Sequence, residues 1–144
     1  MKSIVKAAWT TQLLSGSYTR TNSRKGVIPR CRTASDARSA LGVLLEVYIT
    51  LGDDIGAAWL WSPWINRWGF RSSIKHMDWD TGEVYWEPHE TFARFPEHVC
   101  EWAGMKRTDL GDVCEWTRDT NSHKKIAQLI EEHIDDEDHS SDWI

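Results

Sequence analysis

Several features that define large protein classes are missing from this sequence. No apolar run approaches the roughly 20 residues that a membrane-spanning helix needs. The first residues, MKSIVKAAW, lack the apolar segment of a signal peptide. Three cysteines without paired spacing, Cys31, Cys100 and Cys114, give no disulfide framework. These absences predict a cytoplasmic protein with free thiols and no membrane partner.

The motifs of common catalytic and cofactor sites are missing as well. The chain has no glycine-rich phosphate loop, HExxH, CxxC or nucleophile elbow. His98 and Cys100 lie two positions apart on a predicted helix and face different directions, which disfavours zinc binding together with His89 and Cys114. No catalytic residue, metal or cofactor is therefore expected. A small hydrolase or metalloprotein that uses these side chains stays as the alternative to a binding protein.

Carboxylates near aromatic residues offer another catalytic interpretation. Glu83, Glu87 and Glu90 have the chemistry of a carbohydrate-cleaving site, which needs two carboxylates at a fixed separation. Glu83 is expected in a turn and Glu87 just beyond a strand, so nothing in the sequence fixes such a separation. We expect these residues to face solvent.

Tryptophan and an uneven distribution of charge are what the sequence has in excess. Ten of the 144 residues are tryptophan, whose large ring and N–H group suit small cores and interfaces alike. The formal net charge of −5 argues against direct binding of nucleic acid. Basic residues crowd positions 20–38, whereas positions 131–142 are acidic: Glu131, Glu132, Asp135, Asp136, Glu137, Asp138 and Asp142.

The periodicity of apolar residues predicts a single α+β domain over residues 1–134, followed by an acidic, mobile tail over 135–144. Val5, Trp9 and Leu13 form the apolar stripe of a first helix over residues 2–14. Pro96 and Gly104 bound a short helix near the C-terminal end, and two further helices follow it. Their expected caps are Asp109 for the first, and Asn121 or Ser122 for the second.

Residues 34–51, ASDARSALGVLLEVYITL, predict one long central helix, capped by Thr33 or Ser35. Its apolar face is wide enough to contact other elements on more than one side, or a second copy of the chain in a homo-oligomer. Gly42 costs about 1 kcal/mol within a helix. We therefore expect it to permit the close approach of a neighbouring segment.

Alternating aromatic residues over positions 57–86 predict two hairpins, and hence a small antiparallel sheet of three or four strands. The expected registers place the large rings on one face, which would pack on the central helix. They pair Trp61 with Trp68 and Trp59 with Phe70 in the first hairpin, and Trp79 with Val84 and Met77 with Trp86 in the second.

Three clusters of residues, taken together, resemble a family of small bacteriophage proteins whose function is mostly unassigned. The first resembles a W…L.SG.Y opening, the second an LGVL core and the third an LP..V..WAG helix with an ND…IA..I ending. The matching residues are Trp9, Leu13, Ser15, Gly16 and Tyr18; Leu41 to Leu44; Phe95, Pro96, Val99, Trp102, Ala103 and Gly104; and Asp119, Ile126, Ala127 and Ile130. Ala40 and Leu45 stand where such sequences often have cysteines, so the resemblance implies a shared fold and no shared thiol chemistry.

The loop over residues 17–33, together with the aromatic hairpins, gives the best candidate binding site. Forked guanidinium groups suit phosphate ligands, and exposed rings suit stacking on a base. Trp64 is of interest because it is expected at the tip of a turn, where it cannot join the buried face. The candidate ligand-binding residues are Tyr18, Arg20, Arg24, Lys25, Arg30, Arg32, Trp64 and Arg67.

The sequence thus predicts a non-catalytic phage accessory protein that acts in the host cytoplasm against host defence. In one version it sequesters a phosphorylated nucleotide signal at the basic loop. In the other it inhibits a host defence protein by contact, with the acidic C-terminus imitating nucleic-acid phosphates against a basic surface. A structural component of the virion is a further alternative.

Overall fold

The computed structural model describes residues 1–18, 31–33, 37–92, 94–120 and 122–136. In this part of the chain five helices accompany one antiparallel sheet of three strands, so the predicted α+β class is confirmed. The strands run in the order β1-β2-β3, and the middle strand pairs with both neighbours. The elements are α1 (Ser3–Leu14), α2 (Ala40–Leu51), β1 (Ala58–Ser62), β2 (Arg67–Met77), β3 (Val84–Thr91), α3 (Glu97–Ala103), α4 (Arg107–Asp119) and α5 (His123–His133).

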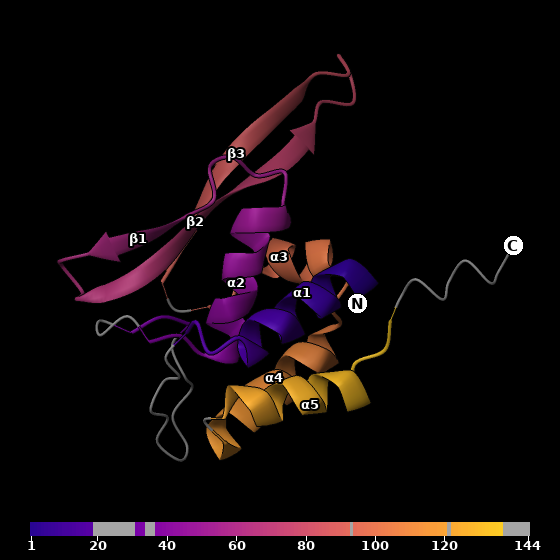
Figure 1. Ribbon diagram of the computed structural model, residues 1–144. Helices are drawn as coiled ribbons and strands as arrows, with labels where there is room; N and C mark the ends of the chain where they lie inside the picture. Colours follow the sequence, from indigo (N-terminus) through magenta and orange to yellow (C-terminus); the bar gives the residue numbers. More distant parts are fainter. Residues whose placement is uncertain (19–30, 34–36, 93, 121, 137–144) are drawn as a thin grey trace, which may run out of the picture.

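Helix α2 lies next to the sheet, α1 and α4 pack against it, and α5 packs on α1 and α4 (Figure 1). Eight of its twelve residues are buried, so its apolar face is covered by the chain itself. Trp9 of α1 is fully buried against it and donates its indole N–H to the Ala40 carbonyl at 2.8 Å. This bond satisfies the polar group of the largest core residue, as a buried indole requires.

The predicted length of the central helix is wrong at its N-terminal end. Helix α2 begins at Ala40, and Ser39 caps it by accepting a hydrogen bond from the Gly42 N–H. Residues 31–33 and 37–39 pair instead as a short antiparallel bridge, in which the Thr33 N–H donates to the Ala37 carbonyl at 2.8 Å. The backbone of these residues is therefore engaged in bridge bonds, so it cannot continue the helix. With twelve residues α2 equals α1 in length, and α4 is longer.

The register of β1 and β2 is the predicted one, with Trp61 opposite Trp68 and Trp59 opposite Phe70. The register of β2 and β3 is shifted by two residues, because Met77 pairs with Val84 and Lys75 with Trp86. The turn between β2 and β3 is therefore longer than predicted, and hydrogen bonds of Asp78 stabilise it. The Asp78 backbone N–H donates to the Glu83 carbonyl, and its carboxylate accepts from the N–H groups of Asp80 and Thr81.

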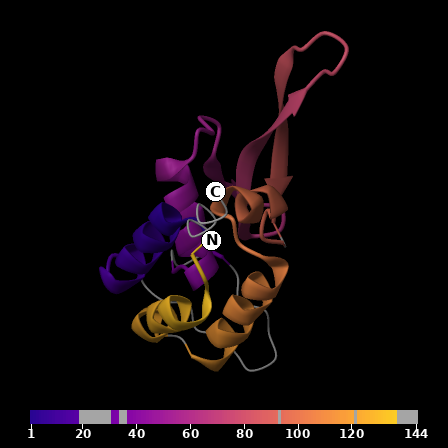
Figure 2. The ribbon, with the colours of Figure 1, turned by 90° about the vertical axis from the view of Figure 1, so that its right-hand side faces the viewer.

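The large apolar residues of the sheet do not share one face: β2 is continuous, so Met77, seven residues after Phe70, lies on the opposite face, together with Val84 and Trp86. Phe70 is buried against Leu45, Tyr48 and Val99. The far end of β2 and β3, here called the arm (residues 75–86), extends past the helices into solvent (Figures 1 and 2). The expectation that Met77, Trp79, Val84 and Trp86 pack on the central helix is therefore wrong, since each of them is exposed.

The C-terminal helices close the domain. Gly104 ends α3, as predicted, and adopts a left-handed conformation. Helix α4 begins at Arg107 rather than after Asp109, which accepts a hydrogen bond from the Lys106 N–H within the first turn. Ser122 caps α5. No helix in the described ranges is long and apolar enough to cross a bilayer.

The start of the predicted acidic tail contacts helix α1. The N-terminal ammonium group donates to the Asp135 carbonyl at 2.9 Å, and Lys6 pairs with Asp136 at 3.3 Å. The Lys6 ammonium also donates to the Ile134 carbonyl. Residues 137–144, which hold the rest of the predicted tail, lie outside the described part of the chain.

Candidate functional site

Five side chains that alternate between aromatic and cationic groups form an arginine–aromatic stack. The Arg38 guanidinium carbon lies 5.2 Å from the centre of the Tyr18 ring and 5.8 Å from that of Trp59. The Arg32 carbon lies 5.4 Å from Trp59 and 3.6 Å from Trp68. The order along the stack is Tyr18, Arg38, Trp59, Arg32 and Trp68. Each arginine thus stands between two rings, an arrangement that cation–π attraction favours.

The backbone bridge explains why two arginines reach the same rings. Arg32 and Arg38 face each other across the pairing of residues 31–33 with 37–39, beside the first residues of α2. Strand β1 supplies Trp59 and β2 supplies Trp68, whose ring also meets that of Trp61 edge-on at 5.4 Å. The stack therefore joins this bridge to the sheet.

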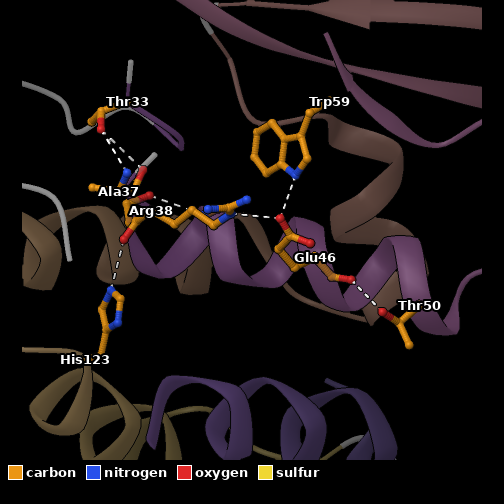
Figure 3. A network of polar contacts seen from close by, with 9 residues as sticks. Thr33, Ala37, Arg38, Glu46, Thr50, Trp59 and His123 are labelled. Atoms are coloured by element: carbon orange, nitrogen blue, oxygen red, sulfur yellow. Dashed lines mark hydrogen bonds and ion pairs between the residues drawn. The ribbon is translucent and has the colours of Figure 1, made fainter. Parts of the chain in front are cut away.

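Glu46 of α2 fixes the middle of the stack (Figure 3). One of its carboxylate oxygens accepts a hydrogen bond from the Arg38 Nε at 2.8 Å and another from the Trp59 indole at 2.7 Å. The side chains of Arg38 and Glu46 are only 11% and 21% exposed. The charge of Arg38 is thus largely neutralised within the fold, and its first role is structural.

The structure describes four of the eight predicted ligand-binding residues. Tyr18 and Arg32 belong to the stack. Arg67 begins β2 and is half-buried, while Trp64 is 94% exposed in the turn between β1 and β2 and is no part of the stack. The others, Arg20, Arg24, Lys25 and Arg30, lie outside the described residues. Within the predicted loop over residues 17–33, the described chain stops at Tyr18 and resumes one residue before Arg32.

The arm has the composition of a contact surface. Five large apolar side chains are 48% to 88% exposed on it: Met77, Trp79, Val84, Tyr85 and Trp86. Asp78, Asp80 and Glu83 are exposed beside them. Met77, Val84 and Trp86 share one face of the two strands, Tyr85 lies on the other face beside His76, and Trp79 lies in the turn. Exposed apolar groups that gather on one projecting element mark interaction sites on protein surfaces, and Trp and Tyr are enriched among the residues that dominate binding energy at interfaces.

A hollow of about 270 Å³ lies where the arm meets the helices. Tyr48, Trp86 and Trp102 supply aromatic walls, and Asp53, Asp54 and Glu101 supply carboxylates. Asp54 is buried and accepts three hydrogen bonds, from the Tyr48 hydroxyl at 2.9 Å and from the backbone N–H groups of Gly56 and Ser73. Burial, followed by this bond to Asp54, raises the pKa of Tyr48. The phenol therefore stays protonated as a donor.

Among the described residues, the histidines and cysteines do not assemble a metal centre. The rings of His89 and His98 meet edge-on with centroids 5.3 Å apart. Across the described residues no three His, Cys, Asp or Glu side chains are placed to hold a metal ion. All three cysteines are free, and burial raises the pKa of Cys31 and of Cys100 to about 12. These two thiols are protonated at neutral pH and poor nucleophiles.

The predicted carboxylates face solvent, and two of them contact basic side chains of β2. Glu87 lies 2.6 Å from His76, and Glu90 lies 3.6 Å from Arg71. Glu83 is exposed in the connection between β2 and β3. Their positions give no pair of carboxylates that flank a cavity, which glycoside cleavage needs.

Arg38, Trp59 and Trp68 are the stack residues that the sequence prediction does not include as ligand-binding positions. The alternating pattern assigns the two tryptophans to the buried face, and it assigns Arg38 to a helix that does not extend so far. One signal is present, because Arg38 belongs to the same basic segment as Arg32. Comparison with known proteins finds no match for this chain among protein-family models, curated proteins or solved structures.

Proposed function

We propose that this protein is a non-catalytic inhibitor that binds a protein partner through its arm. The observation that carries the proposal is the exposure of five large apolar side chains on a hairpin that extends past the helices (Figure 2), namely Met77, Trp79, Val84, Tyr85 and Trp86. Because β2 and β3 pair along the hairpin, it presents such side chains on a hydrogen-bonded element, which lowers the entropy cost of ordering on binding.

Charge indicates the kind of surface that the partner offers. The exposed carboxylates of Asp78, Asp80 and Glu83 accompany the exposed apolar side chains, and the whole chain is acidic, with a net charge of −5. A basic surface with an apolar centre is complementary to both features, and opposite charge would accelerate association. Proteins that bind nucleic acid or nucleotides commonly present basic surfaces.

The resemblance to phage proteins gives the proposal its biological setting. We propose a host defence protein as the partner, inhibited in the host cytoplasm by occlusion of its basic surface. The acidic residues at positions 131–142 would add to the same attraction. Since α2 has its apolar face covered, a homo-oligomer would need a surface other than this helix.

Removal of two arm rings tests the proposal. The double variant Trp79→Ala/Tyr85→Ala should bind the partner at least about thirtyfold more weakly, since interface rings each contribute on the order of 2 kcal/mol. Its thermal stability should be close to that of the unchanged protein, because both rings are exposed. The measurement is quantitative mass spectrometry of proteins that co-purify with each variant from the host, followed by titration of the partner.

A matched control keeps the experiment specific. Ile4→Ala/Leu14→Ala removes two exposed apolar side chains from α1, far from the arm in the sequence. This variant should capture the partner at the level of the unchanged protein. Equal capture by the arm variant and the unchanged protein would refute the proposed function.

The arginine–aromatic stack favours a second candidate function, the binding of a phosphorylated nucleotide. The Arg32 guanidinium carbon lies over the Trp68 ring, 3.6 Å from its centre, a contact that orients the guanidinium group. The basic residues at positions 20–30 lie between Tyr18 and Arg32 in the sequence, and both of these residues belong to the stack. A stacked arginine next to further cations is a suitable receptor for phosphate and for a base.

Titration with ATP, pyrophosphate and adenosine tests this second candidate by tryptophan fluorescence. If it is right, ATP or pyrophosphate should bind saturably, and Arg32→Ala should weaken binding at least about tenfold, as the loss of a charge-assisted hydrogen bond does. Arg24→Ala/Lys25→Ala should weaken it as well. Arg71→Ala, which removes a cation paired with Glu90 on the surface, is the control. An unchanged affinity in Arg32→Ala would eliminate this candidate.

A further inference from the structure

We propose that the hollow at the base of the arm is a receptor for a basic side chain, an arginine above all, of the protein partner. This inference rests on the proposed function, because it names the group that the partner inserts beside the arm. It is supported by the size of the hollow, by its aromatic and charged lining, and by one nitrogen atom that has no partner among the described residues.

The size of the hollow suits a side chain. Its volume of about 270 Å³ is below the range of roughly 300–1,000 Å³ that holds drug-sized ligands. Its lining joins residues of α2, β2, β3 and α3. Trp86 belongs both to this lining and to the exposed apolar side chains of the arm. A partner that covers the arm would therefore also cover the hollow.

The charge of the lining selects a cation. Three carboxylates, those of Asp53, Asp54 and Glu101, line the hollow with a single ammonium group, that of Lys75, among the described residues. Asp54 is held by its three hydrogen bonds, so its negative charge is fixed in place. A guanidinium group that enters would form charge-assisted hydrogen bonds, which are stronger than neutral ones.

The aromatic walls favour the same ligand. Tyr48 and Trp102 meet edge-on with centroids 5.0 Å apart, and Trp86 lines the hollow from β3. Arginine stacks on aromatic faces and is more weakly hydrated than lysine, so it loses less solvation on entering a partly buried site. The Arg32 contact with Trp68 shows the same pairing elsewhere in this fold.

His98 lines the hollow with a ring that has one nitrogen without a hydrogen-bond partner among the described residues. This atom, Nε2, is inaccessible to solvent. A buried polar atom without a partner costs about 1–3 kcal/mol. Burial first, and then the neighbouring His89, lower the pKa of His98, so the imidazole is neutral at pH 7. With its proton on Nδ1, the neutral ring can accept an N–H at Nε2 from an arginine in the hollow once a shift of the lining exposes this atom.

The test uses N-acetyl-arginine amide, whose only charge is the guanidinium group. Titrated into the ¹⁵N-labelled full chain, it should shift the indole N–H signals of Trp86 and Trp102 saturably, in the millimolar range. N-acetyl-glutamine amide, a neutral polar probe, should leave these signals in place. Glu101→Gln combined with Asp53→Asn should weaken the arginine probe at least about tenfold.

A control variant and the partner assay distinguish failure of this inference from failure of the proposed function. Glu97→Gln alters the same helix α3 at a carboxylate that pairs with Arg107 and does not line the hollow, so it should bind the probe normally. Equal shifts with the glutamine probe, or undiminished binding in the Glu101/Asp53 variant, would overturn the inference while the arm could still bind its partner. If instead the arm variant Trp79→Ala/Tyr85→Ala captures the partner normally, the proposed function fails, whatever the probe shows.

Discussion

Gly42→Ala should separate residues 31–33 from helix α2 and strongly destabilise the protein. A Cβ atom at this position would lie 1.8 Å from the Cys31 carbonyl oxygen and 2.8 Å from its carbon. Both are backbone atoms, so no side-chain rotation relieves the clash. Overpacking of this kind costs about 1–3 kcal/mol or more. The gain in helix propensity, about 1 kcal/mol, does not offset it.

Denaturation and thiol labelling together identify the cause of the lower stability expected for Gly42→Ala. The hydrogen bond from the Ser39 N–H to the Cys31 carbonyl, 3.1 Å long, should break in the variant. Cys31, whose pKa burial raises to about 12, should then react faster with a thiol reagent. Gly111→Ala is the matched control, because a methyl group added to this α4 glycine would have no described atom within 4 Å beyond its own helix. It should be neutral or stabilising by up to about 1 kcal/mol, and a similar loss in both variants would contradict this explanation.

Trp9→Ala should lower the free energy of unfolding by about 3–5 kcal/mol, the range for the loss of a large aromatic side chain from a core. Trp9 is fully buried where α1 meets α2, and its indole also donates to the Ala40 carbonyl at 2.8 Å. The variant therefore leaves a cavity and removes a hydrogen bond beside the first turn of α2. Urea denaturation followed by circular dichroism measures the change.

Two other substitutions show whether burial sets the size of this effect. Trp64→Ala removes an indole that is 94% exposed, so it should change stability by no more than about 0.5 kcal/mol. Trp9→Phe keeps a ring in the core but removes the indole donor. Its loss of unfolding free energy should lie between those of Trp9→Ala and Trp64→Ala. Comparable losses in Trp9→Ala and Trp64→Ala would contradict the placement of α1.

Short-range patterns in the sequence are sufficient for part of the fold. The stripe of Val5, Trp9 and Leu13 predicts α1, and the alternation around a short turn predicts the pairing of Trp61 with Trp68.

The residues just before α2 show where local sequence patterns fail to predict the structure. Their alanines and possible capping residues are compatible with a helix, but the bridge between Arg32 and Arg38 uses the backbone groups of residues 37–39 in another way. Such a tertiary override of local preference has no signature in the sequence.

The prediction for the arm fails for a different reason. Alternation shows that Met77, Val84 and Trp86 share a face, which the two-residue shift of the register preserves. In the structure β2 is one continuous strand, so this face is the one opposite to Phe70, which packs on α2. The sequence pattern treats the two hairpins separately, so it does not reveal this. The pattern therefore assigns large apolar residues to the core where the structure exposes them.

The sequence predicts the type of interaction at the candidate site better than it predicts which residues take part. Cations next to aromatic rings do meet, at Arg32 and Trp68. The sequence pattern does not reveal that Glu46 neutralises Arg38 or that the rings come from the supposed buried face. Contacts between residues far apart in the chain decide both facts. The hollow beside the arm depends likewise on the meeting of α2, α3 and the sheet.

Site-specific photo-crosslinking tests the central claim, that the arm binds a protein partner, most directly. A benzophenone side chain at the position of Tyr85, and separately at that of Ile4 on α1, would be activated in host cells that contain the full chain. We expect a crosslinked partner at position 85 and none at position 4, with the attached peptide rich in Lys and Arg. Crosslinking from position 4 but not from position 85, in a protein that still captures its partner, would contradict the account.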